Sequence, residues 1–576
     1  MRAIIPDETK VRLRYPARAV GILGAVLMIA SIMLPWAYGH EALDDMGFYG
    51  APSPLQVFFV ILPVIALLLL AVPLVGKQRL GKFARALAWN TSAKTASIAA
   101  TATVVVALLD IAIELKGLVN VEIGGWIALV GGVLAVAATL LLPDSPEPTL
   151  DRMKSPKWLQ IIAIVVLMAI LLFTAAYALS LDKAGQFLMF AAFLVGVVMV
   201  LRQAGVFAWL GLAAANNNRV LVLSAFVVAF AFPFTQNGSD ANMSIASQVL
   251  IFAAAALGLN IVVGLVGLLD LGYIAFLGAG AFTAAVLSDS AFATVSFKPP
   301  FIVTVLIAGV VSSLLGLLIG APTLRVSGDY LAIVTLAFGE IFRITMNNLD
   351  GTDGPNVTNG PNGIPGIPDL NIFGYDLGSV HDILGIEIGR FANYYWLMLV
   401  VIAVIIVVFM NLNYSRIGRG WVAIREDELA AEAMGVNAFA LKLLAFAGGA
   451  FLAGIAGSVK AHMDTSVTPD QYVFLESAFL LAAVVLGGMG TVMGVLIGAT
   501  ILKLLPEKLR FFSDYRLLVF GLLMVFMMRF RPEGIIADER RQLEFHAEDE
   551  ELAEELEEEM ITHHAHLNLE RKGFDL

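Results

Sequence analysis

The sequence contains no cysteine and unusually little charge. The absence of cysteine excludes disulfide bonds, thiolate metal sites and cysteine-ligated iron–sulfur clusters. Only 14% of the residues are charged, whereas a soluble domain carries about 25%. The short alternating strands of outer-membrane barrels are also absent, and helices are then the only structures that satisfy backbone hydrogen bonds in lipid. These absences exclude a soluble protein, a disulfide-linked protein and a membrane barrel.

Long apolar runs dominate the sequence, which is 59% hydrophobic. Each run is close to the length that crosses a hydrocarbon core of about 30 Å as a helix. We expect an all-α fold, a polytopic transmembrane helical bundle of about 14–16 spans. A short pair, 475–489 and 491–505, suits broken or half helices in the C-terminal core. The other expected spans are 19–37, 55–75, 96–114, 123–142, 159–181, 186–201, 220–235, 246–264, 270–287, 301–320, 330–347, 394–411, 440–460 and 515–530.

Lysine and arginine set the expected orientation, because short cytoplasmic loops carry an excess of both. The loop 76–95 carries five such residues and the loop 412–439 contains Arg416, Arg419 and Arg425, whereas the loop 38–54 contains none. This bias places the N-terminus and the C-terminus in the cytoplasm. The expected location is the bacterial inner membrane, in contact with membrane lipid.

The chain divides into regions of different character. Residues 1–210 form an N-terminal membrane extension of about six helices without identifiable chemistry. Residues 215–535 form a core whose spans are interrupted by glycine and polar residues, and its outside loop 348–393 is too long to be a simple connector. The cytoplasmic tail 537–576 has fourteen acids and four bases and so supplies −10 of the net charge of −11. The remainder is nearly neutral, and we expect no nucleic-acid partner.

One short segment, "REDELAAEAMGVN" (425–437), is too acidic for lipid and lies in a loop expected to be cytoplasmic. Its pattern predicts a helix that Gly435 ends in the C′ position, followed by Asn437 as the N-cap of the next span. Alanine favours this helix, and acids in its first turn interact favourably with the positive end of the helix dipole. The alanines are Ala430 and Ala431, and the acids are Glu426, Asp427 and Glu428.

Several stretches, in this order, resemble ABC importer permeases of the branched-chain amino acid (LivM-type) family. They are "LGLNIVVGLVGLLDLGYIAFLGAGAF", "GDYLAIVTLAFGEIFRI", "GPNGI", "GRGWVAIREDELAAEAMGVNAFALKLLAF", "ESAFLLAAVVLGGMGT" and "FRPEGII". The resemblance implies that 413–439 is a cytoplasmic coupling segment docked on separate ABC ATPase subunits. It also implies a homologous second permease subunit and an extracytoplasmic solute-binding protein. Leu429 stands where the related importer pattern has glutamate, and Glu428 lies one place earlier.

Polar residues within the core are candidates for the translocation path, because ionisable residues inside membranes are commonly functional. Asp270 either lines the path or caps a helix beginning at Leu271. Glu340 and Arg343 are spaced to pair on one helix face, either beside the path or as a structural pair.

Small residues recur every fourth position in the span after the coupling segment. This spacing lets another helix pack closely. The residues are Ala445, Gly449, Ala453 and Gly457.

The sequence offers no catalytic site, metal site or cofactor site. The stretch "GKQRLGKF" (76–83) is close to a phosphate-binding loop, but Phe83 replaces the hydroxyl residue that binds Mg²⁺, and no strand precedes it. We expect a permease without its own ATPase site. The expected function is ATP-driven import of branched-chain or similar amino acids. The alternatives are an ABC permease for urea, short amides or other small solutes, and an ion-coupled secondary transporter.

Overall fold

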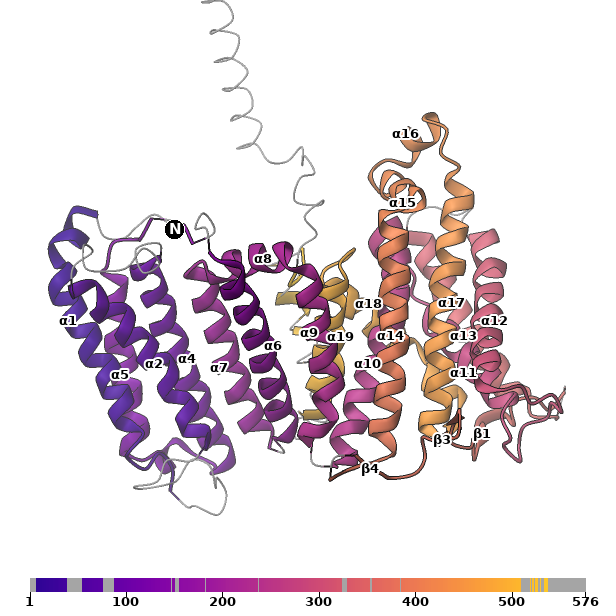
Figure 1. The fold of residues 1–576 in the computed structure, drawn as a ribbon, viewed down its shortest axis with the longest axis horizontal. Coiled ribbons are helices and arrows are strands. Elements are labelled where there is room, and N and C mark those ends of the chain that lie inside the picture. Colours follow the sequence, from indigo (N-terminus) through magenta and orange to yellow (C-terminus); the bar gives the residue numbers. More distant parts are fainter. Residues whose placement is uncertain are drawn as a thin grey trace, which may run out of the picture. The chain divides into compact units, whose positions relative to one another are not determined.

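A computed structural model confirms the all-α, polytopic fold (Figure 1). It describes residues 7–38, 54–75, 87–146, 148–150, 155–181, 183–236, 238–323, 329–352, 355–383, 385–508, 518, 521–522, 524–526, 529 and 533–536. Within these residues, twelve helices are long and apolar enough to cross a membrane. The chain forms two compact units, and the second contains most of the residues after Ser244.

The first unit consists mainly of the helices that precede Ser244, with residues 379–396 and 505–514. Its helices are α1 (Asp7–Ser31), α2 (Pro54–Ala71), η1 (Val72–Val75), α4 (Trp89–Glu114), η2 (Leu118–Asn120), α5 (Ile123–Leu140), α6 (Lys157–Ser180), α7 (Ala184–Gln203), α8 (Val206–Asn216), α9 (Asn218–Ala231) and η3 (Phe232–Gln236). A short antiparallel hairpin joins β4 (His381–Ile383) to β5 (Ile386–Ile388). Glycines allow α1 and α5 to cross closely, since a Cβ at Gly24 would lie 2.5 Å from the carbonyl oxygen of Gly131.

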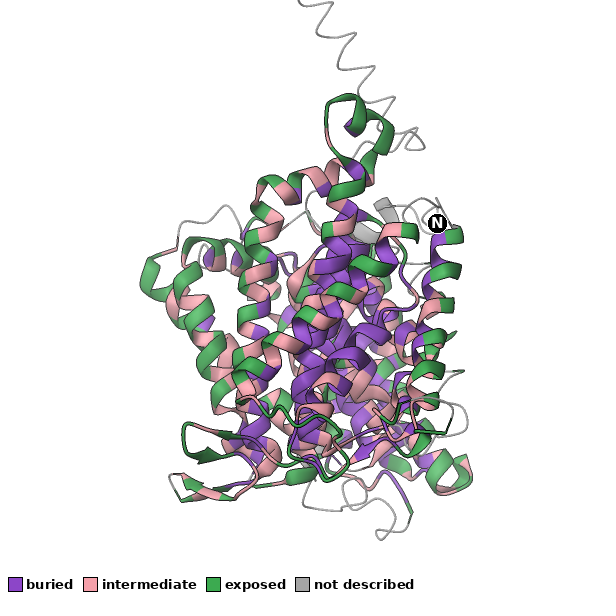
Figure 2. Ribbon diagram, turned by 90° about the vertical axis from the view of Figure 1, so that its right-hand side faces the viewer, coloured by how far each residue is buried: buried purple, intermediate pink, exposed green. Residues whose placement is uncertain are grey.

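The second unit contains the remaining elements. They are α10 (Asp240–Asn260), the π-helix η4 (Ile261–Val266), α11 (Ile274–Val286), α12 (Phe301–Thr323), α13 (Asp329–Asn348), η5 (Gly360–Asn362), α14 (Arg390–Tyr414), α15 (Arg416–Glu426), α16 (Glu428–Ala433), α17 (Ala438–Asp464), η6 (Pro469–Tyr472), α18 (Phe474–Gly487) and α19 (Val492–Lys508). Within it, α17 packs against both α11 and α12. In Figure 2 buried residues are concentrated among these packed helices.

Fifteen of the sixteen expected spans coincide with a helix, twelve of them among the long apolar helices and three with the shorter α2, α11 and α19. The remaining span, 515–530, falls largely outside the described residues. The break 488–491 separates α18 from the shorter α19, and because η6 and α18 together are long enough to cross a membrane, the assignment of the pair as half helices stays a prediction. The short apolar helix α8 was not predicted, because its 11 residues are too few to cross a membrane and lie between two expected spans.

The small-residue stripe of α17 packs as predicted. All four of its members are buried. A Cβ at Gly457 would lie 2.1 Å from the carbonyl oxygen of Leu277 in α11, and one at Gly449 would lie 2.9 Å from the carbonyl oxygen of Gly258 in α10. Contacts this short require glycine, so the stripe holds α17 directly against the backbones of two neighbouring helices.

The long loop after α13 is structured, as its length indicated. Its strand β1 (Ile364–Pro365) pairs antiparallel with β6 (Ser466–Val467), which follows α17. A hairpin joins β2 (Asn371–Ile372) to β3 (Tyr375–Asp376). At the start of the loop, Asp350 accepts a hydrogen bond from the backbone N–H of Thr352 at 2.8 Å, which lowers the pKa of this carboxyl group.

The close packing of α17 predicts that a larger residue at Gly457 lowers thermal stability, and Gly448 on the same helix provides a matched control. Gly457→Ala places a methyl group into the backbone of α11, whereas a Cβ at Gly448 meets nothing within 4 Å. Overpacking costs about 1–3 kcal/mol, while Gly→Ala in a helix otherwise stabilises by about 1 kcal/mol. We expect a lower thermal midpoint in detergent for Gly457→Ala and an unchanged or slightly higher one for Gly448→Ala. Equal midpoints for the two variants would contradict this packing.

Candidate coupling site and interrupted helices

The acidic segment forms a short helix, α16, that projects beyond the ends of α14 and α17 (Figure 1). Asp427 is its N-cap, and the Asp427 carboxylate accepts a hydrogen bond from the N–H of Ala430 at 3.0 Å. The prediction of one helix with three acids in its first turn is therefore partly wrong. Glu426 ends the preceding helix α15, and the chain turns at Asp427 because this residue adopts an extended conformation.

The predicted end of the segment is confirmed. Gly435 has a φ of +88°, and its N–H donates to the carbonyl oxygen of Glu432 at 2.9 Å. The N–H of Val436 donates to the carbonyl oxygen of Ala431 at 3.0 Å, which completes a Schellman motif. Asn437 then caps α17 by accepting from the N–H of Ala440 at 3.0 Å. Both ends of α16 are thus fixed by local hydrogen bonds.

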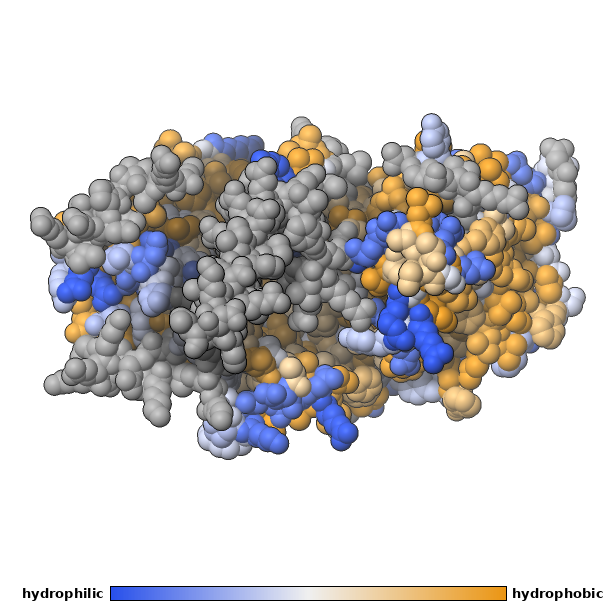
Figure 3. Space-filling model, turned by 90° about the horizontal axis from the view of Figure 1, so that it is seen from above, coloured by the Kyte–Doolittle hydropathy of each residue, from blue (hydrophilic) through white to orange (hydrophobic). Residues whose placement is uncertain are grey.

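The projecting surface of α16 carries two large apolar side chains. Leu429 is 79% exposed and Met434 is 85% exposed. Ala430 is also exposed, whereas Ala431 is only 6% exposed and faces the inside of the segment. In the right-hand part of Figure 3, hydrophilic surface surrounds less polar atoms where the second unit is seen from above. An apolar tip inside a polar rim has the composition of a protein–protein contact.

Side chains beneath the tip attach the segment to α17. The Trp421 side chain is 1% exposed, and its Nε1–H donates to the carbonyl oxygen of Leu441 at 2.8 Å. Glu428 pairs with Lys442 at 2.5 Å. Glu428 therefore holds α16 against α17, which explains why an acid one position away from the importer pattern is compatible with the segment.

Arg425 attaches the same segment to η4. Its guanidinium donates to the carbonyl oxygen of Gly264 at 2.9 Å and also pairs with Glu426 at 3.0 Å. A cation beside the last turn of a helix satisfies free carbonyl groups and interacts favourably with the negative end of the dipole. The coupling segment is thus fixed at two separate helices of the second unit.

Asp270 lies in the non-helical loop between η4 and α11. It is 1% exposed, and its Oδ1 accepts from the N–H of Gly272 at 2.9 Å. The prediction that it caps a helix at Leu271 is wrong, because α11 begins at Ile274 and Tyr273 is the N-cap. Its role in translocation stays a prediction.

The pairing of Glu340 with Arg343 is confirmed. The Arg343 Nε–H donates to Glu340 Oε1 at 3.0 Å, and an Arg343 guanidinium nitrogen lies 3.3 Å from Asp470 of η6. Arg343 therefore links α13 to the segment before α18. Whether a solute passes this cluster is a separate prediction that these contacts do not test.

A second charged pair was not singled out from the sequence. Lys503 of α19 donates to Glu476 of α18 at 2.9 Å, and its ammonium lies 4.6 Å from the centroid of the Phe252 ring. The sequence contained a signal for this pair, since the expected spans 475–489 and 491–505 each contain a single charged residue and the two charges have opposite signs. Their pairing depends on how the two helices fold back on each other.

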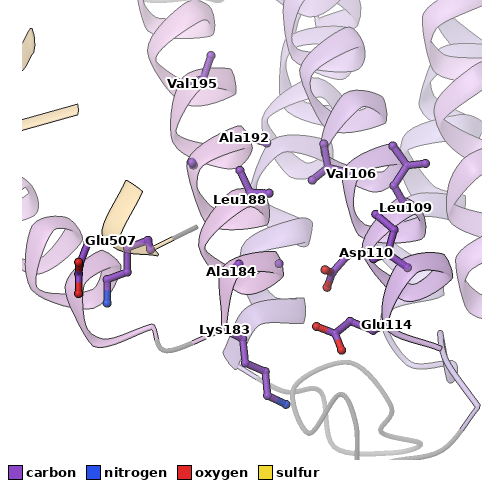
Figure 4. Close-up of a pocket in the computed structure, with 14 residues that line it drawn as sticks. Val106, Leu109, Asp110, Glu114, Lys183, Ala184, Leu188, Ala192, Val195 and Glu507 are labelled. Atoms are coloured by element: carbon purple, nitrogen blue, oxygen red, sulfur yellow. The ribbon is translucent and has the colours of Figure 1, made fainter. Parts of the chain in front are cut away.

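The N-terminal unit contains a cavity of about 690 Å³ between α4 and α7 (Figure 4). Its walls are mostly apolar, and its charged groups gather at one end. In Figure 4, Asp110 and Glu114 of α4 lie on the same side as the Lys183 side chain, whereas Glu507 lines the cavity from the other side of α7. The prediction of a region without chemistry overlooked two acids spaced i, i+4 inside an apolar span. The stretch 76–83 lies outside the described residues.

Apolar spans and interrupted helices are typical of a multi-pass membrane protein, and the comparisons with known proteins place the chain in the permease class. The family model described as "Branched-chain amino acid transport system / permease component" matches residues 241–528. A curated relative, the high-affinity branched-chain amino acid transport system permease protein LivM of Salmonella typhimurium, is 38% identical over 340 residues. This match covers 57% of the present chain and 77% of the relative. The chain belongs to this branched-chain amino acid permease family.

More distant relatives agree with this assignment. A probable branched-chain amino acid transport permease protein LivM of Methanocaldococcus jannaschii is 25% identical over 255 residues, 40% of this chain and 68% of the relative. The branched-chain amino acid permease protein LivH of Escherichia coli is 30% identical over 128 residues, 22% of this chain and 41% of the relative. No solved structure matches the chain.

The cap of α16 makes a local prediction. Asp427→Ala removes the acceptor for the N–H of Ala430, and losing an N-cap costs about 1 kcal/mol, or roughly fivefold in a local opening equilibrium. We expect the amide of Ala430 to exchange hydrogen about fivefold faster, whereas Asp427→Asn, which preserves a capping oxygen, exchanges like the parent. Identical exchange in Asp427→Ala and Asp427→Asn would show that the cap does not hold this turn.

Proposed function

We propose that the chain is the membrane-spanning subunit of an ABC importer that takes up branched-chain amino acids across the bacterial inner membrane. The observation that carries this proposal is the family match over 241–528, which contains the whole coupling segment. Relatives in the family carry names that state branched-chain amino acid transport. The charge bias of the loops supports cytoplasmic N- and C-termini, with the acidic tail 537–576 outside the described residues.

In this proposal the energy for transport comes from separate ATPase subunits that bind α16. The apolar tip, Leu429 and Met434, enters a groove of the ATPase, and Ala430 and Gly435 allow close approach. The chain itself lacks an ATPase site in this account. Because Arg425 and Trp421 attach the segment to two helices, a displacement of α16 moves η4 and α17 with it as a rigid body.

The path lies between this chain and a homologous second permease subunit. A binding protein delivers the amino acid to the outer loops, including 348–393, and supplies most of the selectivity. We keep Asp270, Glu340 and Arg343 as candidate path residues, and 215–535 as the permease core after the extension 1–210. Among the described residues, Glu340 and Arg343 are the more accessible candidates, since Glu340 is 41% exposed.

Two alternatives predict different observations. An ABC permease for urea or short amides would use the same coupling segment with a binding protein that ignores leucine. An ion-coupled secondary transporter would need ion sites at paired broken helices. Within the described residues, no cluster of three His, Asp or Glu side chains suited to a metal ion is present.

A substitution on the tip tests the docking role. Ala430 is exposed, so Ala430→Asp places an unpaired acid in the contact without disturbing the interior of the segment. We expect normal membrane insertion and at least a hundredfold loss of leucine uptake in cells, because burying an unpaired charge costs several kcal/mol. Ala430→Ser, which is small and uncharged, serves as the control and is expected to retain most uptake. Ala431→Asp is a weaker test, because Ala431 is 6% exposed. Normal uptake by Ala430→Asp would contradict docking at this surface.

The energy source and the substrate are tested together in proteoliposomes that contain the complete complex. We expect leucine, isoleucine or valine uptake that requires ATP and persists after ionophores collapse all ion gradients. Uptake that follows an ion gradient without ATP would favour the secondary transporter. ATP-driven uptake of urea or acetamide, with no leucine uptake, would favour the alternative substrate class.

A further inference from the structure

A buried amide lies where α10 changes into the π-helix η4. Asn260 is 0% exposed, in the most buried of the long helices. Its Oδ1 accepts from the N–H of Gly490 at 2.8 Å, and its Nδ2 donates to the carbonyl oxygen of Thr491 at 3.3 Å. Both partners belong to the break between α18 and α19. One side chain therefore satisfies two backbone groups of a non-helical turn in which Gly490 is buried and Thr491 is partly buried.

The backbone next to the Asn260 amide leaves no room for a further side chain. A Cβ at Gly264, one turn further on, would lie 2.0 Å from Asn260 Oδ1 and 2.6 Å from the nitrogen of Gly490. Gly490 itself has a φ of +82°, a conformation that L-residues with side chains rarely adopt. Glycine is thus required on both sides of the Asn260 amide.

The same short helix also contacts the coupling segment. The carbonyl oxygen of Gly264 accepts from Arg425, and a Cβ at Gly267 would lie 2.7 Å from Arg425 Cγ. The residues Asn260 to Gly267 therefore contact both the coupling segment and the α18–α19 break. A π-helix in this position matches the frequent occurrence of π-bulges at functional sites.

The break also binds a segment from near the end of the core. The N–H groups of Ile535 and Ile536 donate to the carbonyl oxygens of Leu486 and Gly487 at 2.9 and 3.0 Å. Gly488, with a φ of +122°, lies against this segment, since a Cβ there would be 1.9 Å from the carbonyl oxygen of Ile536. The free carbonyl groups at the end of α18 are thereby satisfied, and the turn is held from two sides.

We propose that Asn260 is a positioning residue that makes the coupling segment, η4 and the α18–α19 hairpin move as one unit. This inference rests on the proposed function, because it describes how the motion of α16 reaches α18 and α19. When α16 is displaced, the hydrogen bond from Arg425 to the Gly264 carbonyl moves η4. The hydrogen bonds of Asn260 with Gly490 and Thr491 then move the break between α18 and α19. Without the Asn260 side-chain amide, η4 moves independently of α18 and α19, so that ATP is hydrolysed with little transport of solute.

The test uses the complete complex in proteoliposomes and compares the number of ATP molecules hydrolysed per leucine imported. We expect Asn260→Ala to raise this ratio at least tenfold, with an ATPase rate and an affinity for the loaded binding protein close to those of the parent. Gly264→Ala, which displaces the amide without removing it, is expected to raise the ratio in the same direction. Ser458→Ala is the control, because its buried hydroxyl donates only within its own helix, and its ratio is expected to stay within twofold.

A distance measurement keeps the proposal testable even if both variants fail to fold. The chain has no cysteine, so spin labels attach only at Arg416→Cys in α15 and Met493→Cys in α19, which are both exposed. We expect one narrow distance distribution that nucleotide binding by the ATPase leaves unchanged, because both labels belong to one moving unit. In Asn260→Ala the distribution is expected to broaden at least twofold.

Two results would overturn the role of Asn260. One is a folded Asn260→Ala complex whose ATP-to-leucine ratio is within twofold of the parent. The other is a nucleotide-dependent change of the 416–493 distance in the parent complex. Failure of the parent complex to import leucine with ATP would instead refute the proposed function, so the two failures are distinguishable.

Discussion

A backbone N–H or C=O without a partner is costly inside a membrane, and the second unit depends on how its interrupted helices meet this requirement. After η4, the N–H of Leu271 donates to Thr335 Oγ1 of α13, and the N–H of Ile274, the first residue of α11, donates to Ser477 Oγ of α18. The break between α18 and α19 is satisfied by Asn260. Each interruption is therefore hydrogen-bonded to another helix.

The need to satisfy free backbone groups also explains how the coupling segment is attached to the membrane helices. A helix as short as α16 is not stable alone, so its shape comes from its caps and from attachment to larger elements. Trp421 and the Glu428–Lys442 pair attach it to α17, and Arg425 attaches it to η4. In the proposed mechanism, a displacement at Leu429 or Met434 is transmitted to η4 and α17. The small-residue stripe of α17 then transmits it to the helix backbones that the stripe contacts.

Local signals in the sequence predicted local structure well. Asn437 and Gly435 were correctly placed because a cap and a Schellman motif depend on residues within one turn. The i, i+3 pair Glu340–Arg343 and the stripe on α17 follow from helix geometry for the same reason. Asp270 was misassigned because an aspartate directly before an apolar run resembles an N-cap, whereas the helix begins later, at Ile274. Contacts of Asn260 with Gly490 and of Arg425 with Gly264 join residues more than 150 positions apart. No periodicity encodes such contacts.

The central claim is that a separate ATPase subunit binds the apolar tip of α16, Leu429 and Met434. The chain has no cysteine, so cross-linking from a single introduced thiol reports one position without background. The account predicts that Met434→Cys, at a site 85% exposed, cross-links efficiently to the ATPase subunit in membranes. Phe373→Cys, at a site 96% exposed in the long outer loop, does not. Cross-linking to the ATPase from Phe373→Cys, or none from Met434→Cys in an actively transporting complex, would contradict it.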